Sequence, residues 1–331
     1  MNNYRYSLDK TSRKFKCPAC GKKTFVLYRD SQSDEYMEDE FGRCDREDNC
    51  GHQCYPAGLS KSDSRSYTQK KMIKPAVMAR TEKVEFLPTE LITRSMVKYY
   101  ENNFVIYLKS LFGDDLASDL INKYMIGTSK LWPGATIFWQ VDISGNTRQC
   151  KVMLYEPTTG KRVKDEIEPK IKFLGKQLLG NYDAYLQQCF FGEHLLAKFP
   201  DLKVAICESE KTAIIASAYL PEYIWIATGG KQGCSLNKPS VCKVIDGRNV
   251  TLFPDLNAYC DWSAKSINMK KLTTAKIKIS DVLERNANLE QKQAGYDLAD
   301  FMIVRNEVSG VAIGINGYPV SWDHISKQIN N

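Results

Sequence analysis

From residue 203 onward the chain alternates short apolar runs with longer stretches of helix-forming residues. Each run is rich in β-branched residues and ends at a turn signal, which is typical of a buried strand. Alternation of strands and helices through short loops permits few folds, and it predicts a parallel, doubly wound α/β sheet. The expected strands are 203–207, 223–227, 249–253 and 276–279, and the expected helices are 211–219, 258–271 and 281–305.

Two of these predicted strands end at a carboxylate. The first strand stops at Glu208, and the third is followed by Asp255. Ligands of parallel α/β sheets bind outside the carboxyl ends of the strands, so we expect both carboxylates on one rim. That arrangement suits a divalent metal ion facing a phosphate. The alternative for Asp255 is a helix N-cap ahead of Ala258.

Composition limits the classes of protein that the chain can belong to. At 331 residues, with 43% hydrophobic residues, it is long enough for two or three domains with real cores. The net charge of 46 − 39 = +7 permits a polyanionic partner. No apolar stretch reaches membrane-spanning length, and the polar, basic start lacks a signal-type segment, so we expect no membrane contact and a cytoplasmic protein. The eleven cysteines then indicate metal ligands and buried thiols rather than disulfides.

Five of the cysteines lie close to the N-terminus. Cys17-Pro-Ala-Cys20 is followed by glycine, which is the form of a zinc knuckle, and tetrahedral zinc needs four such ligands. Cys44 and Cys50 supply the second pair. A strand at 23–28, an acidic loop at 34–40 and a return at Phe41 complete the layout of a zinc ribbon, held together by Zn²⁺ because so short a segment has little core.

The second half of this ribbon leaves alternatives open. Five residues separate Cys44 from Cys50, where a tight knuckle has two, and His52 and Cys54 compete with them as ligands. Free thiols without a metal are a further alternative. A ribbon of this kind contacts nucleic acid in some proteins and has a purely structural or protein-docking role in others.

The segment between this ribbon and the α/β region has two parts. Residues 58–84 lose periodicity and are polar and basic, which is typical of a linker that is either simply solvated or follows a phosphate backbone. Residues 85–200 are predicted to form an α+β region, with helices within 88–127 and two strands, 135–142 and 147–155, joined by a Gly-Asn turn. The resulting domains are 1–57, 58–84, 85–200 and 201–305, with a C-terminal tail at 306–331 that carries no motif.

Basic and aromatic residues gather in the second half of the α+β region. Their mixture fits a nucleic-acid groove, in which bases stack on aromatic rings, and it fits a solvated antiparallel face equally well. The residues concerned are Trp132, Trp139, Arg148, Lys151, Tyr155, Lys170, Lys172, Phe173 and Lys176.

The order of the motifs resembles a known family. Glu208-Ser-Glu210-Lys-Thr-Ala213 after one strand, Gly229-Gly230 after the next and Asp255-Leu-Asn257-Ala258 after the third are similar to a Toprim domain. With a zinc ribbon ahead of it, the resemblance narrows to DNA primases of the bacterial and phage kind. Two segments of the α+β region, 123–127 and 138–145, are similar to the primase core, so the resemblance covers most of residues 15–305.

The resemblance implies a magnesium site and residues that contact the nucleotide. Glu208 would be a Mg²⁺ ligand or general acid/base, and Asp255 a Mg²⁺ ligand. Gly229 and Gly230 would either let the backbone approach a phosphate or form a simple turn that needs positive φ. The nucleotide-binding set is Asn257, Gly229, Gly230 and Asp300.

The chain departs from the family pattern at two places. Asn257 stands where the family has a second aspartate, and an amide oxygen can bind Mg²⁺ but brings no charge. Lys211 and Thr212 replace an acidic residue. The acidic side chains that could supply the missing charge are Asp261, Asp297 and Asp300.

These features lead to three hypotheses. The first is a primase-like nucleotidyltransferase that makes short RNA primers from ribonucleotides on single-stranded DNA. Because no Gly-x-x-x-x-Gly-Lys-Ser/Thr element is present, its helicase would be a separate protein, as expected of a phage or mobile element. The second, favoured by Asn257, is a catalytically weakened Toprim DNA-binding protein of a mobile element's replication or mobilisation system. The third is a Toprim nuclease, which the ribbon and the α+β region fit less well.

Overall fold

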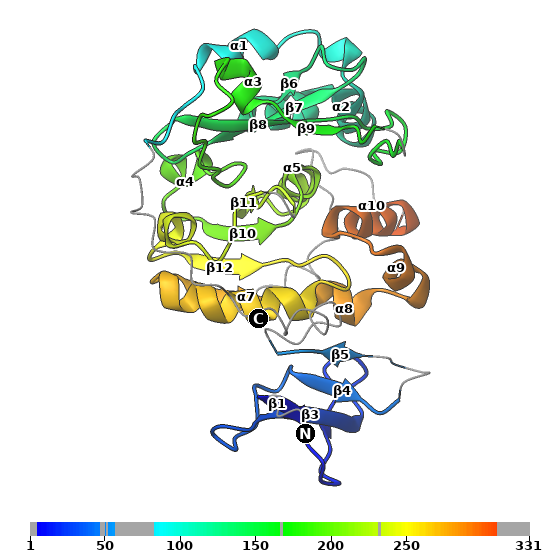
Figure 1. Ribbon diagram of the computed structural model, residues 1–331. Helices are drawn as coiled ribbons and strands as arrows, with labels where there is room; N and C mark the ends of the chain where they lie inside the picture. Colours follow the sequence, from blue (N-terminus) through cyan, green and yellow to red (C-terminus); the bar gives the residue numbers. More distant parts are fainter. Residues whose placement is uncertain are drawn as a thin grey trace.

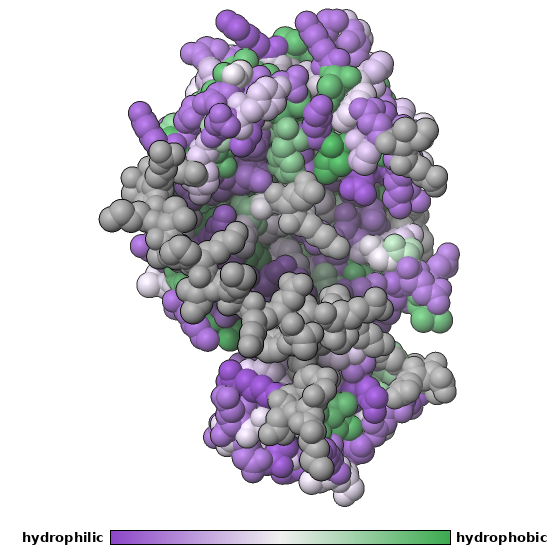
Figure 2. Space-filling view, viewed as in Figure 1, coloured by the Kyte–Doolittle hydropathy of each residue, from purple (hydrophilic) through white to green (hydrophobic). Residues whose placement is uncertain are grey.

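A computed structural model describes residues 5–46, 50, 52–56, 83–165, 168–230 and 233–309, with the side chains of 304–309 excepted. The predicted linker at 58–84 and the tail at 306–331 lie almost entirely outside these residues. Three β-sheets follow one another along the molecule, with the N-terminal sheet at one end and the parallel sheet in the middle (Figure 1). The described surface in view is mostly hydrophilic, with hydrophobic residues scattered over it (Figure 2). No described helix has the length and apolar character needed to cross a bilayer.

The N-terminal sheet is antiparallel throughout. Its strands run in the order β1-β3-β4-β5, and β2 pairs with β3. The predicted strand at 23–28 and the return at Phe41 are confirmed as β3 and β4. The strands are β1 (Tyr6–Leu8), β2 (Phe15–Lys16), β3 (Lys23–Asp30), β4 (Gly42–Cys44) and β5 (Gln53–Cys54).

The second sheet is also antiparallel, in the order β6-β7-β8-β9. The two predicted strands are confirmed as β7 and β8, which the Gly145 turn connects. Helical residues precede the sheet and follow it. The elements are α1 (Glu90–Ser95), η2 (Tyr99–Glu101), α2 (Asn103–Lys123), β6 (Gly127–Thr128), β7 (Thr136–Val141), β8 (Thr147–Met153), β9 (Ile171–Phe173), α3 (Gly175–Leu179) and α4 (Leu195–Lys198).

The third sheet is the parallel sheet that the sequence predicted. Its order is β11-β10-β12-β13, and all three pairings are parallel. Helix α5 lies on one face of the sheet and α7 on the other (Figure 1). The elements are β10 (Lys203–Cys207), α5 (Glu210–Tyr219), β11 (Tyr223–Ala227), α6 (Pro239–Cys242), η3 (Lys243–Ile245), β12 (Asn249–Leu252), α7 (Tyr259–Leu272), β13 (Lys276–Ile279), α8 (Val282–Asn286), α9 (Leu289–Ala294) and α10 (Leu298–Ser309).

The last predicted helix differs from the structure. Residues 281–305 form three helices rather than one. The extended backbone of Ala287 ends α8, and Asn288 caps the start of α9 together with Gln291. Gly295, with a φ of 66°, then ends α9 in the left-handed region. The break matters for the site, because it allows α10 to start beside α5, against which it packs. Asp297, which immediately precedes α10, is thereby brought next to the strand ends.

One hydrophobic core extends across the second and third sheets. Phe138 of β7 and Trp225 of β11 belong to the same buried cluster. Tyr124 stacks on Phe191 at 5.3 Å between ring centroids, and its hydroxyl donates to the Trp225 carbonyl at 3.0 Å. Each such fully buried aromatic side chain contributes about 1.5–3 kcal/mol by leaving water. The two sheets therefore hold side chains from both at set positions relative to one another.

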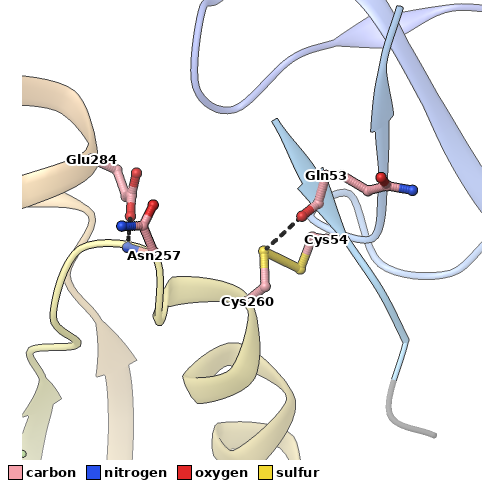
Figure 3. The surroundings of a disulfide bond; sticks show 5 residues. All are labelled: Gln53, Cys54, Asn257, Cys260 and Glu284. Atoms are coloured by element: carbon pink, nitrogen blue, oxygen red, sulfur yellow. Dashed lines mark hydrogen bonds between the residues drawn. A yellow bond between two sulfur atoms is a disulfide. The ribbon is translucent and has the colours of Figure 1, made fainter. Parts of the chain in front are cut away.

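The N-terminal sheet docks on the outer side of α7. Tyr28 and Phe41 pack with Ala264 and Ile267 of that helix. A disulfide between Cys54 and Cys260 crosses the same contact (Figure 3). This corrects the expectation of thiols without disulfides, because spacing along the chain carries no information about two cysteines 206 residues apart.

Candidate functional site

Four cysteines of the N-terminal sheet converge on one point. Within the described residues, theirs is the only group of three or more His, Cys, Asp or Glu ligand atoms lying within 4.8 Å of one another. The Sγ atoms are 3.8 Å apart for Cys17 and Cys50 and 4.0 Å apart for Cys20 and Cys44. Four thiolates each about 2.3 Å from a tetrahedral Zn²⁺ lie about 3.8 Å from one another, so these sulfurs fit that ion.

The first knuckle prepares its thiols for a metal. Gly21, with a φ of 69°, lets the chain fold back so that its amide donates to the Cys17 carbonyl at 2.9 Å. The backbone N–H of Lys22 lowers the pKa of Cys20 to about 6. Burial raises the pKa of Cys17 to about 12, so this thiol keeps its proton until a bound metal ion displaces it.

The two competing ligands lie outside this cluster. Cys54 is bonded to Cys260, and the ring of His52 packs against Phe25 with 5.6 Å between centroids. The main-chain carbonyl of His52 accepts a hydrogen bond from the Cys44 amide at 2.8 Å. This bond connects the end of β4 to the residue just before β5. The set formed by Cys17, Cys20, Cys44 and Cys50 is thus the one that the structure brings together.

Carboxylates gather at the carboxyl edge of the parallel sheet. Strands β10 and β12 are neighbours, with Ile206 opposite Leu252, so the segments carrying Glu208 and Asp255 leave the sheet side by side. Glu208 is half-buried, and among the described residues its side chain has no hydrogen bond or ion pair. The Oδ1 atom of Asp255 is buried and lacks a hydrogen-bond partner in the described part of the chain. Such an oxygen calls for a proton or a cation.

The electrostatic surroundings of Asp255 also favour a proton or a cation on its carboxylate. Burial first, then the nearby Asp297, Glu208 and Asp300, raise the pKa of Asp255 to about 8, against the opposing charge of Lys211. A divalent cation would replace the proton on this carboxyl. Because no three acidic residues in the described part of the chain bring ligand oxygens within 4.8 Å of one another, a cation at this edge would have one or two carboxylate ligands. Mg²⁺ characteristically takes one or two carboxylates and completes its shell with water and phosphate oxygens.

Two aspartates from the start of α10 adjoin these carboxylates. Asp297 accepts the Thr212 hydroxyl at 2.8 Å and caps α10 through the Asp300 amide, also at 2.8 Å. Lys211 donates to Asp300 at 2.7 Å and lies 3.7 Å from Asp297. Lys211 and Thr212 therefore hold these two aspartates in place. Asp261 is elsewhere, paired with Lys265 on the exposed side of α7.

The glycine pair forms a turn against Glu208. Gly229 and Gly230 both have a φ of 84°, a conformation that glycine adopts at least cost. Their amides each donate to the Glu208 carbonyl at 3.0 Å. These N–H groups thus secure the backbone of Glu208.

Asn257 points toward α9. Its side-chain Nδ2 donates to the Lys292 carbonyl at 2.9 Å. Its backbone N–H donates to the Glu284 carboxylate at 3.4 Å, as Figure 3 shows. The residue has a φ of 69°, which asparagine tolerates better than most residues. A carboxylate could not donate to the Lys292 carbonyl, so this contact is specific to the amide.

Two residues at this edge are not predicted to lie there, because the sequence pattern places Lys151 in the basic and aromatic groove and gives Glu210 no role. Lys151 of β8 and Glu210 of α5 form an ion pair of 2.9 Å, with side chains only 5% and 1% exposed. Lys151 also donates to the Gly229 carbonyl at 3.0 Å. The signal in the sequence is a lysine in the otherwise apolar run 150–154, since a cation placed there needs a buried partner.

The predicted aromatic and basic groove loses its central members. Trp139 and Tyr155 are 2% and 3% exposed, so neither ring is open to a base, and the Trp139 indole donates to the Ser95 hydroxyl at 2.9 Å. Lys170 lies over Trp132 and pairs with two acidic side chains. The surface that remains fits the solvated antiparallel face better than a stacking groove.

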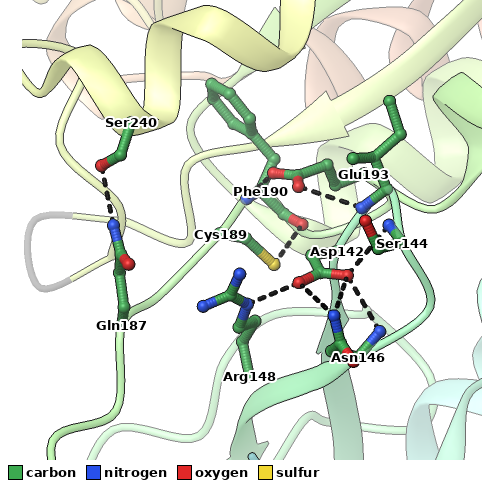
Figure 4. A network of polar contacts seen from close by, with 10 residues as sticks. Asp142, Ser144, Asn146, Arg148, Gln187, Cys189, Phe190, Glu193 and Ser240 are labelled. Atoms are coloured by element: carbon green, nitrogen blue, oxygen red, sulfur yellow. Dashed lines mark hydrogen bonds and ion pairs between the residues drawn. The ribbon is translucent and has the colours of Figure 1, made fainter. Parts of the chain in front are cut away.

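The end of the segment 138–145 organises the β7–β8 turn. Asp142 accepts the amides of Ser144 and Asn146 and the Arg148 guanidinium, the last at 2.6 Å (Figure 4). Beside it, the Glu193 carboxylate accepts the amides of Ile143 and Phe190, each at 3.1 Å. The network joins the turn to the loop before α4.

Comparisons with known proteins fall into two groups. Residues 4–65 match the model of a zinc β-ribbon finger family, and residues 102–256 match a domain of unknown function, DUF6371. No curated protein sequence matches the chain. The ribbon match and the four-cysteine cluster both identify Zn²⁺ as the metal of the N-terminal sheet.

Solved structures similar to the chain are DNA primase fragments. The primase fragment of the bacteriophage T7 primase-helicase protein is 14% identical, with 81% of this chain and 88% of that chain covered and a TM-score of 0.34. The zinc-binding and RNA polymerase domains of the Aquifex aeolicus primase are 10% identical, with 92% and 80% covered and a TM-score of 0.34. A DNA primase domain from Pseudomonas aeruginosa is 14% identical, with 60% and 61% covered and a TM-score of 0.30. The structural neighbours of this chain are thus phage and bacterial primase fragments.

Proposed function

We propose that this protein is a primase-like nucleotidyltransferase that synthesises short RNA primers on single-stranded DNA. The observation that carries the proposal is the buried, unpartnered Oδ1 of Asp255, which lies beside Glu208 at the carboxyl edge of a parallel sheet. A carboxylate left in this state is a ready ligand for a hard cation. The two segments that begin at Glu208 and Asp255 resemble a Toprim domain, which agrees with this interpretation.

Magnesium bound at this edge would neutralise the charge that develops as the α-phosphate of a ribonucleotide is attacked by a 3′-hydroxyl and pyrophosphate leaves. The chain's own residues would bind the ion and orient the reacting groups. Asp255 would hold the ion. Glu208, whose side chain makes no hydrogen bond or ion pair among the described residues, would hold it as well or accept the hydroxyl proton.

The remaining nucleotide-binding residues have supporting positions. Asp300 keeps Lys211 beside Asp297, and so sets the charge that surrounds Asp255. Gly229 and Gly230 leave the edge open because they carry no Cβ, while their amides secure Glu208. Asn257 would contact the nucleotide only through its amide oxygen, since its Nδ2 is bonded to Lys292.

The other parts of the chain have roles in this proposal too. We assign template binding to the zinc ribbon at 1–57 with the basic linker at 58–84, and catalysis to a primase-core subdomain at 85–200 with a Toprim domain at 201–305. The partners are single-stranded DNA, ribonucleotides and a separate helicase, in the setting of a mobile element.

Asn257 favours a second function. If the hydrogen bond to the Lys292 carbonyl is the reason for an asparagine at this position, the chain has exchanged a metal ligand for a structural contact. The protein would then be a catalytically weakened Toprim DNA-binding protein of a mobile element's replication or mobilisation system.

Primer synthesis distinguishes these two functions. Purified protein is given single-stranded DNA, labelled ribonucleotides and Mg²⁺ or Mn²⁺, beside Glu208→Gln, Asp255→Asn and the control Asp261→Asn, whose carboxylate pairs with Lys265 away from the edge. We expect primers from the wild type and the control, and at least a hundredfold less from the two edge variants. Intact DNA binding without primers on any template would reject the enzyme and support the second function. In that case Asn257→Asp should increase Mn²⁺ affinity.

A further inference from the structure

A buried ion pair joins two sheets of different type at the carboxylate edge. Lys151 belongs to β8 of the antiparallel sheet, and Glu210 is the first residue of α5, directly after the parallel strand β10. Their charged atoms are 2.9 Å apart and almost fully shielded from water. By comparison, the Arg148 and Lys211 side chains remain 20% and 12% exposed in their own ion pairs.

Stability alone does not explain such a pair. The free energy lost when two charges leave water is about as large as their mutual attraction, and an apolar pair of similar size commonly serves a core as well. A buried pair does hold its two elements in one arrangement, because any slip leaves a charge unpaired. The pair therefore indicates a need for a set position more than a need for stability.

The contacts of Lys151 lead to Glu208 from two directions. Its ammonium donates to the Glu210 carboxylate, two residues beyond Glu208, and also to the Gly229 carbonyl at 3.0 Å. Gly229 in turn donates to the Glu208 carbonyl. One ammonium group thus restrains the helix start that follows Glu208 and the turn that lies against it.

The absence of a side chain at Gly229 leaves space for the Glu210 carboxylate. A Cβ at that position would stand 3.3 Å from Oε1 of Glu210, closer than an ordinary van der Waals contact. That same Oε1 atom is buried without a hydrogen-bond partner among the described residues. The glycine thus makes room for the carboxylate that Lys151 holds.

We infer that Lys151 is a positioning residue for the carboxylate edge, which it serves by fixing Glu208 through Glu210 and the Gly229 turn. The inference rests on the proposed function, because it takes the edge to be a metal site. Residues that orient metal ligands from behind typically change metal affinity by about 10–100-fold when they are replaced.

The test compares Mn²⁺ affinity, read from the electron paramagnetic resonance signal of the free ion, in full-length variants. Lys151→Met combined with Glu210→Met removes the pair without leaving a buried charge. Arg148→Met is the matched control, because Arg148 lies on the same strand and pairs with Asp142 without contacting α5 or the glycine turn. We expect the double variant to unfold at a temperature close to that of the wild type but to bind Mn²⁺ at least about tenfold more weakly, with the control unchanged.

Primer synthesis adds a second readout. A positioning role lowers kcat of the double variant and leaves its affinity for single-stranded DNA as in the wild type. Wild-type Mn²⁺ affinity and kcat in a folded double variant would overturn the inference and leave the proposed function standing. A wild-type protein that binds no Mn²⁺ would overturn both.

Lys151→Arg provides the comparison should the double variant fail to fold. It keeps the charge but replaces the compact ammonium by a planar guanidinium. That group cannot donate to Glu210 and to the Gly229 carbonyl in the same geometry. We expect weaker Mn²⁺ binding in this folded variant as well, and unchanged binding would count against the inference.

Discussion

The disulfide between Cys54 and Cys260 joins strand β5 of the zinc ribbon to the first turn of α7. That helix starts at Tyr259, just beyond the loop that carries Asp255 and Asn257. The covalent link therefore attaches the ribbon close to the candidate metal site, on the side of the sheet opposite α5 (Figure 1).

Reduction of this bond should loosen the ribbon. Without it, the described contact between the ribbon and α7 consists mainly of apolar packing around Phe41 and Ile267. We expect a dithiol reductant to lower the free energy of unfolding by about 2–4 kcal/mol. Urea unfolding with and without reductant measures the change, and Cys260→Ser should show no response to reductant. An equal response in wild type and variant would contradict the link.

Zinc content follows from the cysteine cluster. We expect one zinc per chain by elemental analysis, and a loss of most of it in Cys20→Ser because three ligands hold the ion far less tightly than four. Cys54→Ala is the matched control from the same ribbon, since Cys54 lies outside the cluster, and it should retain zinc. Much less than one zinc per wild-type chain would exclude the site.

Gly229→Ala should destabilise the protein more than the same change at another left-handed glycine. Gly247 has a φ of 73°, and a Cβ added there would meet nothing within 4 Å, so Gly247→Ala costs only the backbone strain, about 1 kcal/mol. Gly229→Ala adds crowding against Glu210 and should cost about 2–3 kcal/mol in all. Urea unfolding of both variants gives the difference, and equal losses would show that the turn yields without disturbing Glu210.

Stability should fall as the pH rises toward neutral, because of Glu193. Burial, with a smaller contribution from Asp142, raises the pKa of Glu193 to about 7 from 4.5. The hydrogen bonds from the Phe190 and Ile143 amides and the charge of Arg148 oppose this rise. The folded state then binds the proton more tightly than the unfolded chain. The resulting stabilisation is complete below pH 4.5 and is lost as the pH passes 7. Because a tenfold change in proton affinity corresponds to about 1.4 kcal/mol, the loss is up to about 3 kcal/mol.

Unfolding at several pH values between about 4.5 and 8 checks this prediction. Glu193→Gln removes the titrating group, and its stability should vary less over that range than that of the wild type. Because the Glu193 carboxylate accepts two amides, the variant will be less stable overall, so the comparison is of slopes and not of absolute values. Parallel slopes for the two proteins would reject Glu193 as the source.

Local patterns predicted the parts of the fold that depend on short stretches of chain. The strands that end at Cys207 and Leu252 were visible because a parallel strand buried on both faces is a continuous apolar run. The ribbon was visible because a knuckle needs two cysteines a few residues apart. Helix breaks were harder to predict, and Gly295 divided a stretch that periodicity alone predicts as one helix.

The candidate site was predictable in part. Glu208 and Asp255 could be placed on one rim because the carboxyl ends of neighbouring parallel strands meet there. Their surroundings could not, since the pKa of Asp255 depends first on burial and then on neighbours that include Asp297 and Asp300. These two aspartates reach the edge only through the packing of α10 on α5. The structural use of Asn257 depends likewise on a carbonyl that lies 35 residues away.

The sequence by itself determined β3, β4, β7, β8 and the four parallel strands, together with the cysteine knuckle and the two carboxylates at strand ends, because each is encoded within a few consecutive residues. Only the tertiary structure decided that Lys151 meets Glu210 and that Cys54 meets Cys260. These partners lie 59 and 206 residues apart. Which distant side chains share a buried space depends on how the sheets pack, and one-dimensional spacing carries no trace of that packing.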